Sequence, residues 1–183
     1  MRLLALIGFL AIIIALAAGV FFFGGYYNIA ATQTDLPPVA WALETVREAS
    51  IGRHAATELA PFALDDPATI QAGARAFAAQ GCINCHGGPG VQWAKFSEGL
   101  RPDPPDLKDV VNDMQPAEFF WVIKNGINMT GMPSFARAGA SDDDIWRIVA
   151  FIKKLPSVSE ADFKAWTAAP TPAAPAAPSA PQQ

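Results

Sequence analysis

The sequence predicts an all-α protein. In several segments apolar residues recur at spacings of three and four, the period of a helix that is buried along one face. These segments start at a capping residue or a proline and stop at a glycine or a proline, as helices do. No segment alternates convincingly between apolar and polar residues with the period of two that a half-buried strand has. We therefore predict helices throughout, with at most small hairpins in the loops.

One long apolar segment lies near the N-terminus. Residues 3–23 are 21 consecutive residues without a charged or hydrogen-bonding side chain. A helix of this length rises about 30 Å, which matches the hydrocarbon core of a bilayer. Arg2 lies beside it and favours an orientation with the N-terminus in the cytoplasm. A cleaved signal peptide is the alternative, since Ala-Leu-Ala at 15–17 resembles a cleavage site. We expect a retained transmembrane helix, and both interpretations export the rest of the chain.

Composition divides the chain into four parts. We predict an N-terminal anchor over residues 1–27, a connector over 28–66, a compact domain over 67–166 and a tail over 167–183. The tail is rich in proline and alanine and has no charged side chain, so we expect it to be extended or disordered. The net charge of −4 gives no reason to expect nucleic acid as a partner.

The connector contains one predicted helix, over residues 38–59. Its apolar stripe consists of Val39, Leu43, Val46 and Ala49. The spacing of this stripe predicts an amphipathic helix that packs on the domain or on a partner subunit.

Three helices are predicted in the compact domain. The first begins at Asp66, which can cap its N-terminus, and ends at Gly81, which suits a left-handed stop. The second covers residues 116–124 and ends before a glycine. The third covers residues 141–155; it has a serine cap, three aspartates in its first turn and two lysines in its last, where these charges offset the helix dipole.

The strongest chemical signal is the run Cys-Ile-Asn-Cys-His at residues 82–86. Two thiols three positions apart can reach the two vinyl-derived carbons of one haem, and the adjacent imidazole then falls beneath the iron as its proximal ligand. The motif occurs once. The sequence therefore predicts one covalently attached haem c, bonded to Cys82 and Cys85 and ligated by His86.

Other uses of these cysteines are less consistent with the sequence. Two cysteines cannot form a disulfide framework, and a thioredoxin-like dithiol needs a βαβ unit that is not visible here. A zinc site would need His54 as a fourth ligand beside the motif, and adjacent Cys85 and His86 make tetrahedral closure awkward.

A haem held in this way needs a second axial ligand or keeps an open position. The candidates are Met114, Met129, Met132 and His54. We favour Met132, because the glycine before it lets the backbone approach the ring and the proline after it fixes the loop. A thioether ligand also raises the reduction potential. We expect the other two methionines to fill the core and His54 to lie at the surface or on a partner.

From about residue 66 to residue 155 the chain resembles the class I cytochrome c family, and most closely its bacterial, membrane-anchored, single-haem members. The matching pieces are Gly73 and Phe77, the motif at 82–86, Pro105-Asp106-Leu107, Gly131-Met132-Pro133 and residues 149–152.

The resemblance implies a class I cytochrome c-like fold and a set of residue roles. Gly73 should let the first and last helices cross closely, with Phe77 packed near Phe151. The carbonyl of Pro105 should accept a hydrogen bond from the ring of His86, with Pro104 as a competing choice. The remaining axial ligand would be the methionine at position 132.

We expect a non-enzymatic electron-transfer protein. A six-coordinate iron leaves no position for a small-molecule substrate, so its partners would be redox proteins or subunits of a respiratory or photosynthetic membrane complex. The expected location is the bacterial inner membrane, with one membrane pass and the haem domain in the periplasm. The alternative is an open-site haem protein, a peroxidase or a gas sensor, which requires that Met132 does not bind the iron.

Overall fold

The computed structural model describes residues 2–168. Most of the predicted tail, from residue 169 onward, lies outside the described residues. The helices, in chain order, are α1 (Arg2–Phe23), α2 (Pro37–Ala55), α3 (Pro67–Ala79), α4 (Ile83–His86), η1 (Lys95–Gly99), α5 (Leu107–Val110), α6 (Pro116–Asn125), α7 (Asp142–Lys154), η2 (Leu155–Ser157) and α8 (Glu160–Ala168). The only strand-like pairing within residues 2–168 is an isolated bridge between Gly88 and Val91. The prediction of an all-α fold is confirmed.

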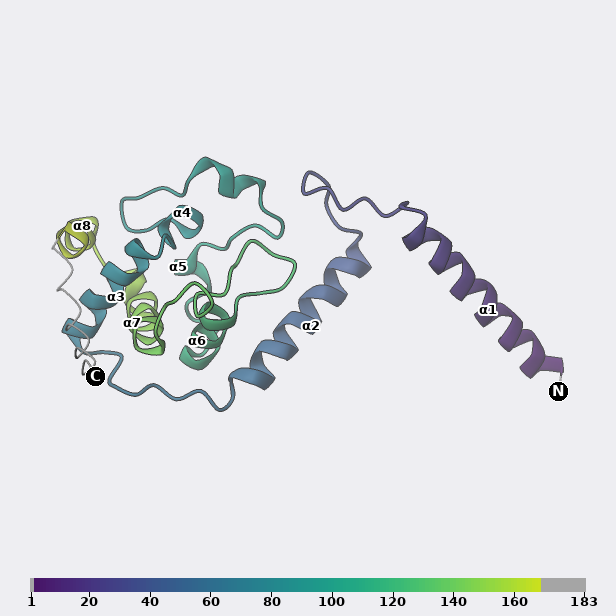
Figure 1. Ribbon diagram of the computed structural model, residues 1–183, viewed down its shortest axis with the longest axis horizontal. Coiled ribbons are helices and arrows are strands. Elements are labelled where there is room, and N and C mark those ends of the chain that lie inside the picture. The colour runs from purple at the N-terminus through teal and green to yellow at the C-terminus, as the bar shows by residue number, and fades with distance from the viewer. Residues whose placement is uncertain (1, 169–183) are drawn as a thin grey trace, which may run out of the picture. The chain divides into compact units, whose positions relative to one another are not determined.

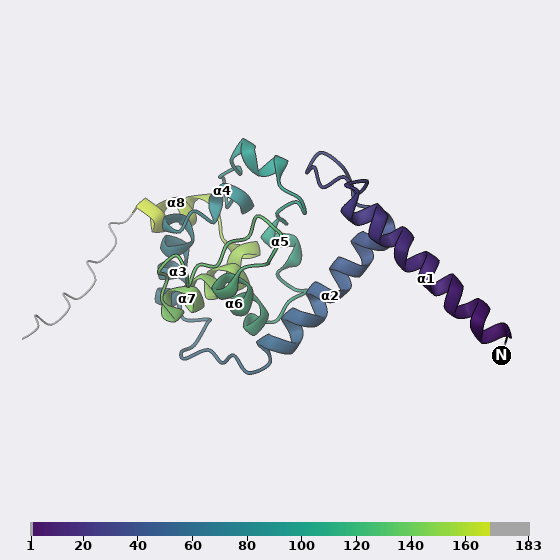
Figure 2. The ribbon, with the colours of Figure 1, turned by 45° about the vertical axis from the view of Figure 1, so that its right-hand side comes forward.

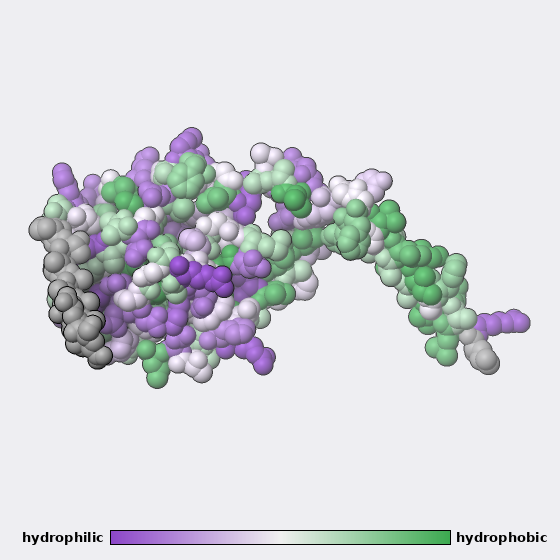
Figure 3. Space-filling model, viewed as in Figure 1, coloured by the Kyte–Doolittle hydropathy of each residue, from purple (hydrophilic) through white to green (hydrophobic). Residues whose placement is uncertain are grey.

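Contacts divide the chain into two units, and the boundary between them follows Leu36. The first unit contains α1, a helix of 22 residues that is long and apolar enough to cross a membrane. Apolar side chains cover its surface, as Figure 3 shows. A membrane anchor and a signal sequence share these properties.

The core of the second unit is built on the crossing of α3 and α7 (Figure 1). A Cβ atom added at Gly73 would lie 1.9 Å from the carbonyl oxygen of Arg147, so only glycine allows this approach. The ring centroids of Phe77 and Phe151 are 5.2 Å apart. The expected close crossing and its aromatic pair are therefore confirmed.

The predicted ends of these helices are also confirmed. The side chain of Asp66 accepts a hydrogen bond of 2.8 Å from the backbone N–H of Thr69 at the start of α3. Gly81, just beyond the end of α3, has a φ of 78°. At the start of α7, the hydroxyl of Ser141 accepts a hydrogen bond of 3.1 Å from the backbone N–H of Asp144.

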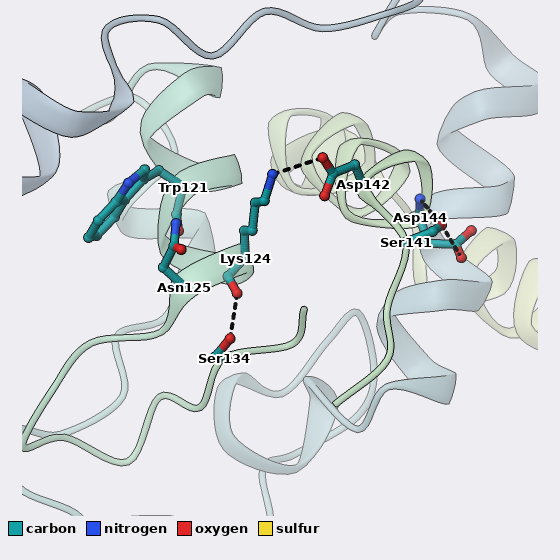
Figure 4. Close-up of polar contacts among 7 residues, drawn as sticks. All are labelled: Trp121, Lys124, Asn125, Ser134, Ser141, Asp142 and Asp144. Carbon is teal, nitrogen blue, oxygen red and sulfur yellow. Dashed lines mark hydrogen bonds and ion pairs between the residues drawn. The ribbon is translucent and has the colours of Figure 1, made fainter. Parts of the chain in front are cut away.

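Helix α6 joins α7 at one end of the core. Phe120 stacks on Trp146, with ring centroids 4.2 Å apart. Figure 4 shows the ammonium group of Lys124, at the end of α6, which lies 2.8 Å from a carboxylate oxygen of Asp142 at the start of α7. This ion pair places a cation near the C-terminus of one helix and an anion near the N-terminus of the other, where the helix dipoles favour them.

Helix α2 packs on α6 through its last turn and a half. The buried residues are Ile51 and Ala55, which are 8% and 1% exposed. The apolar stripe that predicts the helix lies on roughly the opposite side of α2, because each residue advances about 100°. Leu43 and Val46 in that stripe are 55% and 67% exposed. The stripe is therefore not the face that packs on the domain.

Helix α8 is not predicted by the apolar pattern. Its first turn is fixed by Ser159, whose hydroxyl accepts a hydrogen bond of 3.1 Å from the backbone N–H of Asp162. Its one buried residue, Phe163, stacks on Phe151 of α7 with centroids 5.5 Å apart. The signal in the sequence is the run Ser-x-x-Asp shortly after Pro156.

Candidate functional site

The two cysteines and the adjacent histidine lie on one turn of chain. Cys82 precedes α4, and Cys85 and His86 belong to it. The backbone N–H of Cys82 donates to the carbonyl of Phe77, 3.1 Å away, and so fixes the turn to the end of α3. Cys82 is buried, Cys85 is half-buried, and both are free thiols. Burial raises the pKa of Cys82 to about 12, so the free thiol is protonated at neutral pH.

The ring of His86 is held by a distant carbonyl. Its Nδ1 atom lies 2.9 Å from the carbonyl oxygen of Pro105, 19 residues along the chain. A carbonyl oxygen can only accept, so Nδ1 carries the proton and Nε2 keeps its lone pair. Burial lowers the pKa of His86, although the bond to Pro105 and the charge of Asp106 oppose this shift. The imidazole is therefore held neutral and oriented, as a metal ligand must be.

A cavity of about 230 Å³ opens beside this turn. Its lining residues are Cys85, Trp93, Ser97, Glu98, Asp103, Pro104 and Asp106. A smaller cavity of about 110 Å³ borders His86 on residues that include Trp93 and Leu155. Trp93 lines both cavities. The attachment turn, residues 82–86, is thus bordered by two cavities.

Met132 lies on a loop that is tied back to the end of α6. The backbone N–H of Met132 donates to the hydroxyl of Thr130, 3.1 Å away, and its carbonyl accepts from the N–H of Ile127. The hydroxyl of Ser134 donates to the carbonyl of Lys124 over 2.7 Å (Figure 4). A Cβ atom at Gly126 would lie 2.8 Å from the Met132 carbonyl oxygen, so glycine is required where the loop closes.

Sequence reasoning missed the part that Thr130 and Gly126 play in this loop. The hydroxyl of Thr130 also donates to the carbonyl of Ile127, 2.8 Å away, so one side chain pairs with the backbone on both sides of the loop. A threonine two residues before the methionine is a usable signal, because such hydroxyls bond to nearby backbone groups in turns. The side chain of Met132 is half-buried and packs against the core.

The other axial candidates have different surroundings. Met114 packs against the core, as expected. Met129 does not: it is 88% exposed and adopts a φ of 59° near the tip of the loop, so the expectation of a core methionine is wrong there. His54 is exposed on α2; its Nδ1 atom donates to the carbonyl of Ser50, and its ring lies 5.7 Å from that of Trp121.

These residues fit a covalently attached haem. Two free thiols and a neutral, oriented imidazole occupy one turn beside a cavity, which is the donor set that such a haem uses. A zinc site has less support, because no group of three Cys, His, Asp or Glu side chains comes together as a metal site anywhere in residues 2–168.

Comparison with known families agrees with this geometry. Residues 68–152 match the family model described as "Cytochrome C oxidase, cbb3-type, subunit III". No curated protein and no solved structure matches the chain significantly. The matched segment runs from the first turn of α3 nearly to the end of α7, and so contains the attachment turn, Pro105 and Met132. Residues 68–152 are therefore a cytochrome c domain of the class I family, and they are similar to the cbb3-type subunit III family.

Proposed function

We propose that this chain transfers single electrons through one haem c. Cys82 and Cys85 would hold the haem by thioether bonds, and His86 and Met132 would be the axial ligands. The observation that carries the proposal is the hydrogen bond of 2.9 Å from His86 to Pro105, formed directly beside two free thiols. When bound, the haem supplies an iron that changes charge by one electron without breaking bonds.

Pro105 orients the proximal ligand in this proposal. Its carbonyl fixes the proton of His86 on Nδ1 and leaves the lone pair of Nε2 available to bind the iron of the haem. A ring held in this way keeps its geometry when the charge of the metal changes. The carbonyl that accepts the bond belongs to Pro105, whereas Pro104 lines the larger cavity.

Met132 would complete the coordination and exclude substrates. The tied loop supports this role, because Thr130, Gly126 and Ser134 fix the backbone on both sides of the methionine. A thioether favours ferrous iron and raises the potential. If His86 and Met132 both bind the iron, the chemistry that remains would be electron transfer with other redox proteins.

We further propose that α1 remains as a single-pass anchor in the bacterial inner membrane, with the domain in the periplasm. The apolar length of the helix and Arg2 at its N-terminal end support this orientation. A tether of this kind raises the concentration of the domain near membrane complexes. The family model carries the name of an oxidase subunit, which supports a respiratory complex as the partner.

The covalent haem is tested first. The full chain is expressed in a host that attaches haem c, and its pyridine haemochrome is recorded after acid-acetone extraction. We expect a c-type spectrum that remains with the polypeptide. A colourless protein, or a haem that is extracted, contradicts the proposal.

The second axial ligand is tested on the same protein. The oxidised form should show the weak far-red charge-transfer band of sulfur ligation, and Met132→Ala should abolish it. Met129→Ala is the matched control: its side chain is 88% exposed, so the band should be unchanged. If the unmodified protein lacks the band and its reduced form binds carbon monoxide readily, the open-site alternative holds instead.

A further inference from the structure

A glycine-rich turn, residues 87–91, follows the attachment motif directly. It is closed by a narrow bridge: the N–H of Gly88 donates to the carbonyl of Val91 over 2.8 Å, and the N–H of Val91 donates back over 2.9 Å. Gly87 and Gly90 have φ values of 66° and 71°. Glycine restricts the backbone least of all residues. The N–H of Gly87 donates to the carbonyl of Ile83 over 3.0 Å, and side chains that pack on the turn also help to fix its position.

Helix α8 supplies packing of this kind. Figure 2 shows α8 next to α4, the helix that the turn follows. A Cβ atom at Gly88 would lie 3.3 Å from Cε1 of Phe163, and one at Gly90 would lie 2.9 Å from Cγ of Glu160. The backbone of the turn is thus in direct contact with two side chains of α8. Phe163 is only 3% exposed, so its ring is enclosed on its other sides by the core.

Phe163 ends a row of three aromatic rings. Phe77 and Phe151 lie 5.2 Å apart, and Phe151 and Phe163 lie 5.5 Å apart, measured between ring centroids. At the other end of the row, the carbonyl of Phe77 accepts the hydrogen bond from the N–H of Cys82. One row therefore supports the attachment segment both where it begins and just after it ends.

We propose that Phe163 is a positioning residue for the proximal ligand, because it fixes the 87–91 turn and thereby keeps the ring of His86 on the carbonyl of Pro105. The role toward haem rests on the proposed function. Helix α8 lies beyond residues 68–152, so this support comes from outside the segment that matches the family. Without the ring of Phe163, the turn loses this apolar contact, and the ring of His86 is held less firmly on the carbonyl of Pro105.

Hydrogen exchange measured by NMR on the full chain in detergent tests this role. In Phe163→Leu we expect the amides of Gly88 and Val91, and the Nδ1 proton of His86, to exchange about tenfold faster than in the unmodified protein. Phe120→Leu is the matched control. It replaces a similarly buried phenylalanine, whose ring stacks on Trp146. In this control the same protons should exchange within about twofold of the unmodified rate.

A second variant tests the contact itself. Gly88→Ala places a methyl group 3.3 Å from the ring of Phe163, so the alanine should accelerate exchange in the turn. In the Gly88→Ala/Phe163→Leu double variant the smaller side chain makes room, and the two effects should be less than additive.

The outcomes separate this proposal from the proposed function. Equal acceleration in Phe163→Leu and Phe120→Leu, or none in either, overturns the positioning role. The two amides can be followed with or without haem. A protein that never binds haem would end the proposed function, while the amide rates would still decide whether Phe163 holds the turn.

Discussion

Helices α2 and α8 flank the family-matched segment on its two sides and contact the domain in different ways. α8 has nine residues and a single buried side chain, Phe163, which lies between α7 and the 87–91 turn. α2 has 19 residues, but only its C-terminal part is buried, through Ile51 and Ala55. The shorter helix is therefore bound more closely to the site. Apolar spacing identifies a helix, but it does not decide which neighbour, if any, that face will meet.

The largest expected effect comes from removing the contact of α8. Phe163→Ala should lower the free energy of unfolding by about 3–5 kcal/mol, because the variant loses a buried ring and leaves a cavity. Urea unfolding followed by far-UV circular dichroism measures the change. A loss below about 1 kcal/mol would mean that α8 contributes no more than an exposed segment does.

A smaller effect is expected for α2. Ile51→Ala should cost about 2 kcal/mol, at the low end for a buried isoleucine, because the residue lies at the end of the packed surface. Val46→Ala removes a similar side chain that is 67% exposed and should change stability by less than about 0.5 kcal/mol. Both are measured by the same unfolding experiment. Equal losses in the two variants would show that the stripe is buried by a contact of its own.

Removing the N-terminal cap of α8 should have a moderate effect on stability. Ser159→Ala removes the hydroxyl that accepts the N–H of Asp162, which should cost about 1 kcal/mol. Thermal unfolding of the variant is compared with that of Ser157→Ala. Ser157 is exposed, and its hydroxyl donates to the carbonyl of Lys154 and does not cap α8, so its replacement should lower the midpoint less.

The smallest effect concerns pH, since α3 is capped by a carboxylate and α8 by a hydroxyl. Hydrogen bonds from the backbone N–H and the hydroxyl of Thr69 lower the pKa of Asp66 below its usual 3.8. The stabilisation that the Asp66 carboxylate gives the folded protein is therefore complete above the unfolded-state pKa of 3.8. It is lost as the pH falls through the lower pKa of the folded state. Asp66→Asn keeps an acceptor that does not titrate, so its stability should fall less on acidification. Denaturant titrations between pH 6 and pH 2.5 compare the two proteins; parallel curves would contradict the assignment.

Features fixed by neighbouring residues could be predicted from the sequence. Ser141 caps its own helix and Gly81 ends its own, so both could be placed without any tertiary information. The motif at 82–86 is local for the same reason, since one turn of chain brings its three functional side chains together. The close approach at Gly73 joins distant segments and followed only from the family resemblance.

Features that depend on distant partners could not be predicted in this way. The stripe of α2 has the spacing of a buried face, but the core places Ile51 against α6 instead. Helix α8 is too short for a periodic pattern, and one aromatic residue determines how it packs. Met129 and Met132 are three residues apart and chemically identical, so only the path of the loop decides which one meets the core.

The exposure of Met129 has a chemical consequence. Its thioether projects into water from a loop whose backbone is fixed elsewhere, whereas Met114 and Met132 are shielded by the core. Of the three methionines within residues 2–168, dilute hydrogen peroxide should therefore convert Met129 to its sulfoxide first. The product would be a protein heavier by one oxygen atom with an unaltered fold, so this residue can take up oxidative damage before the neighbouring thioether does.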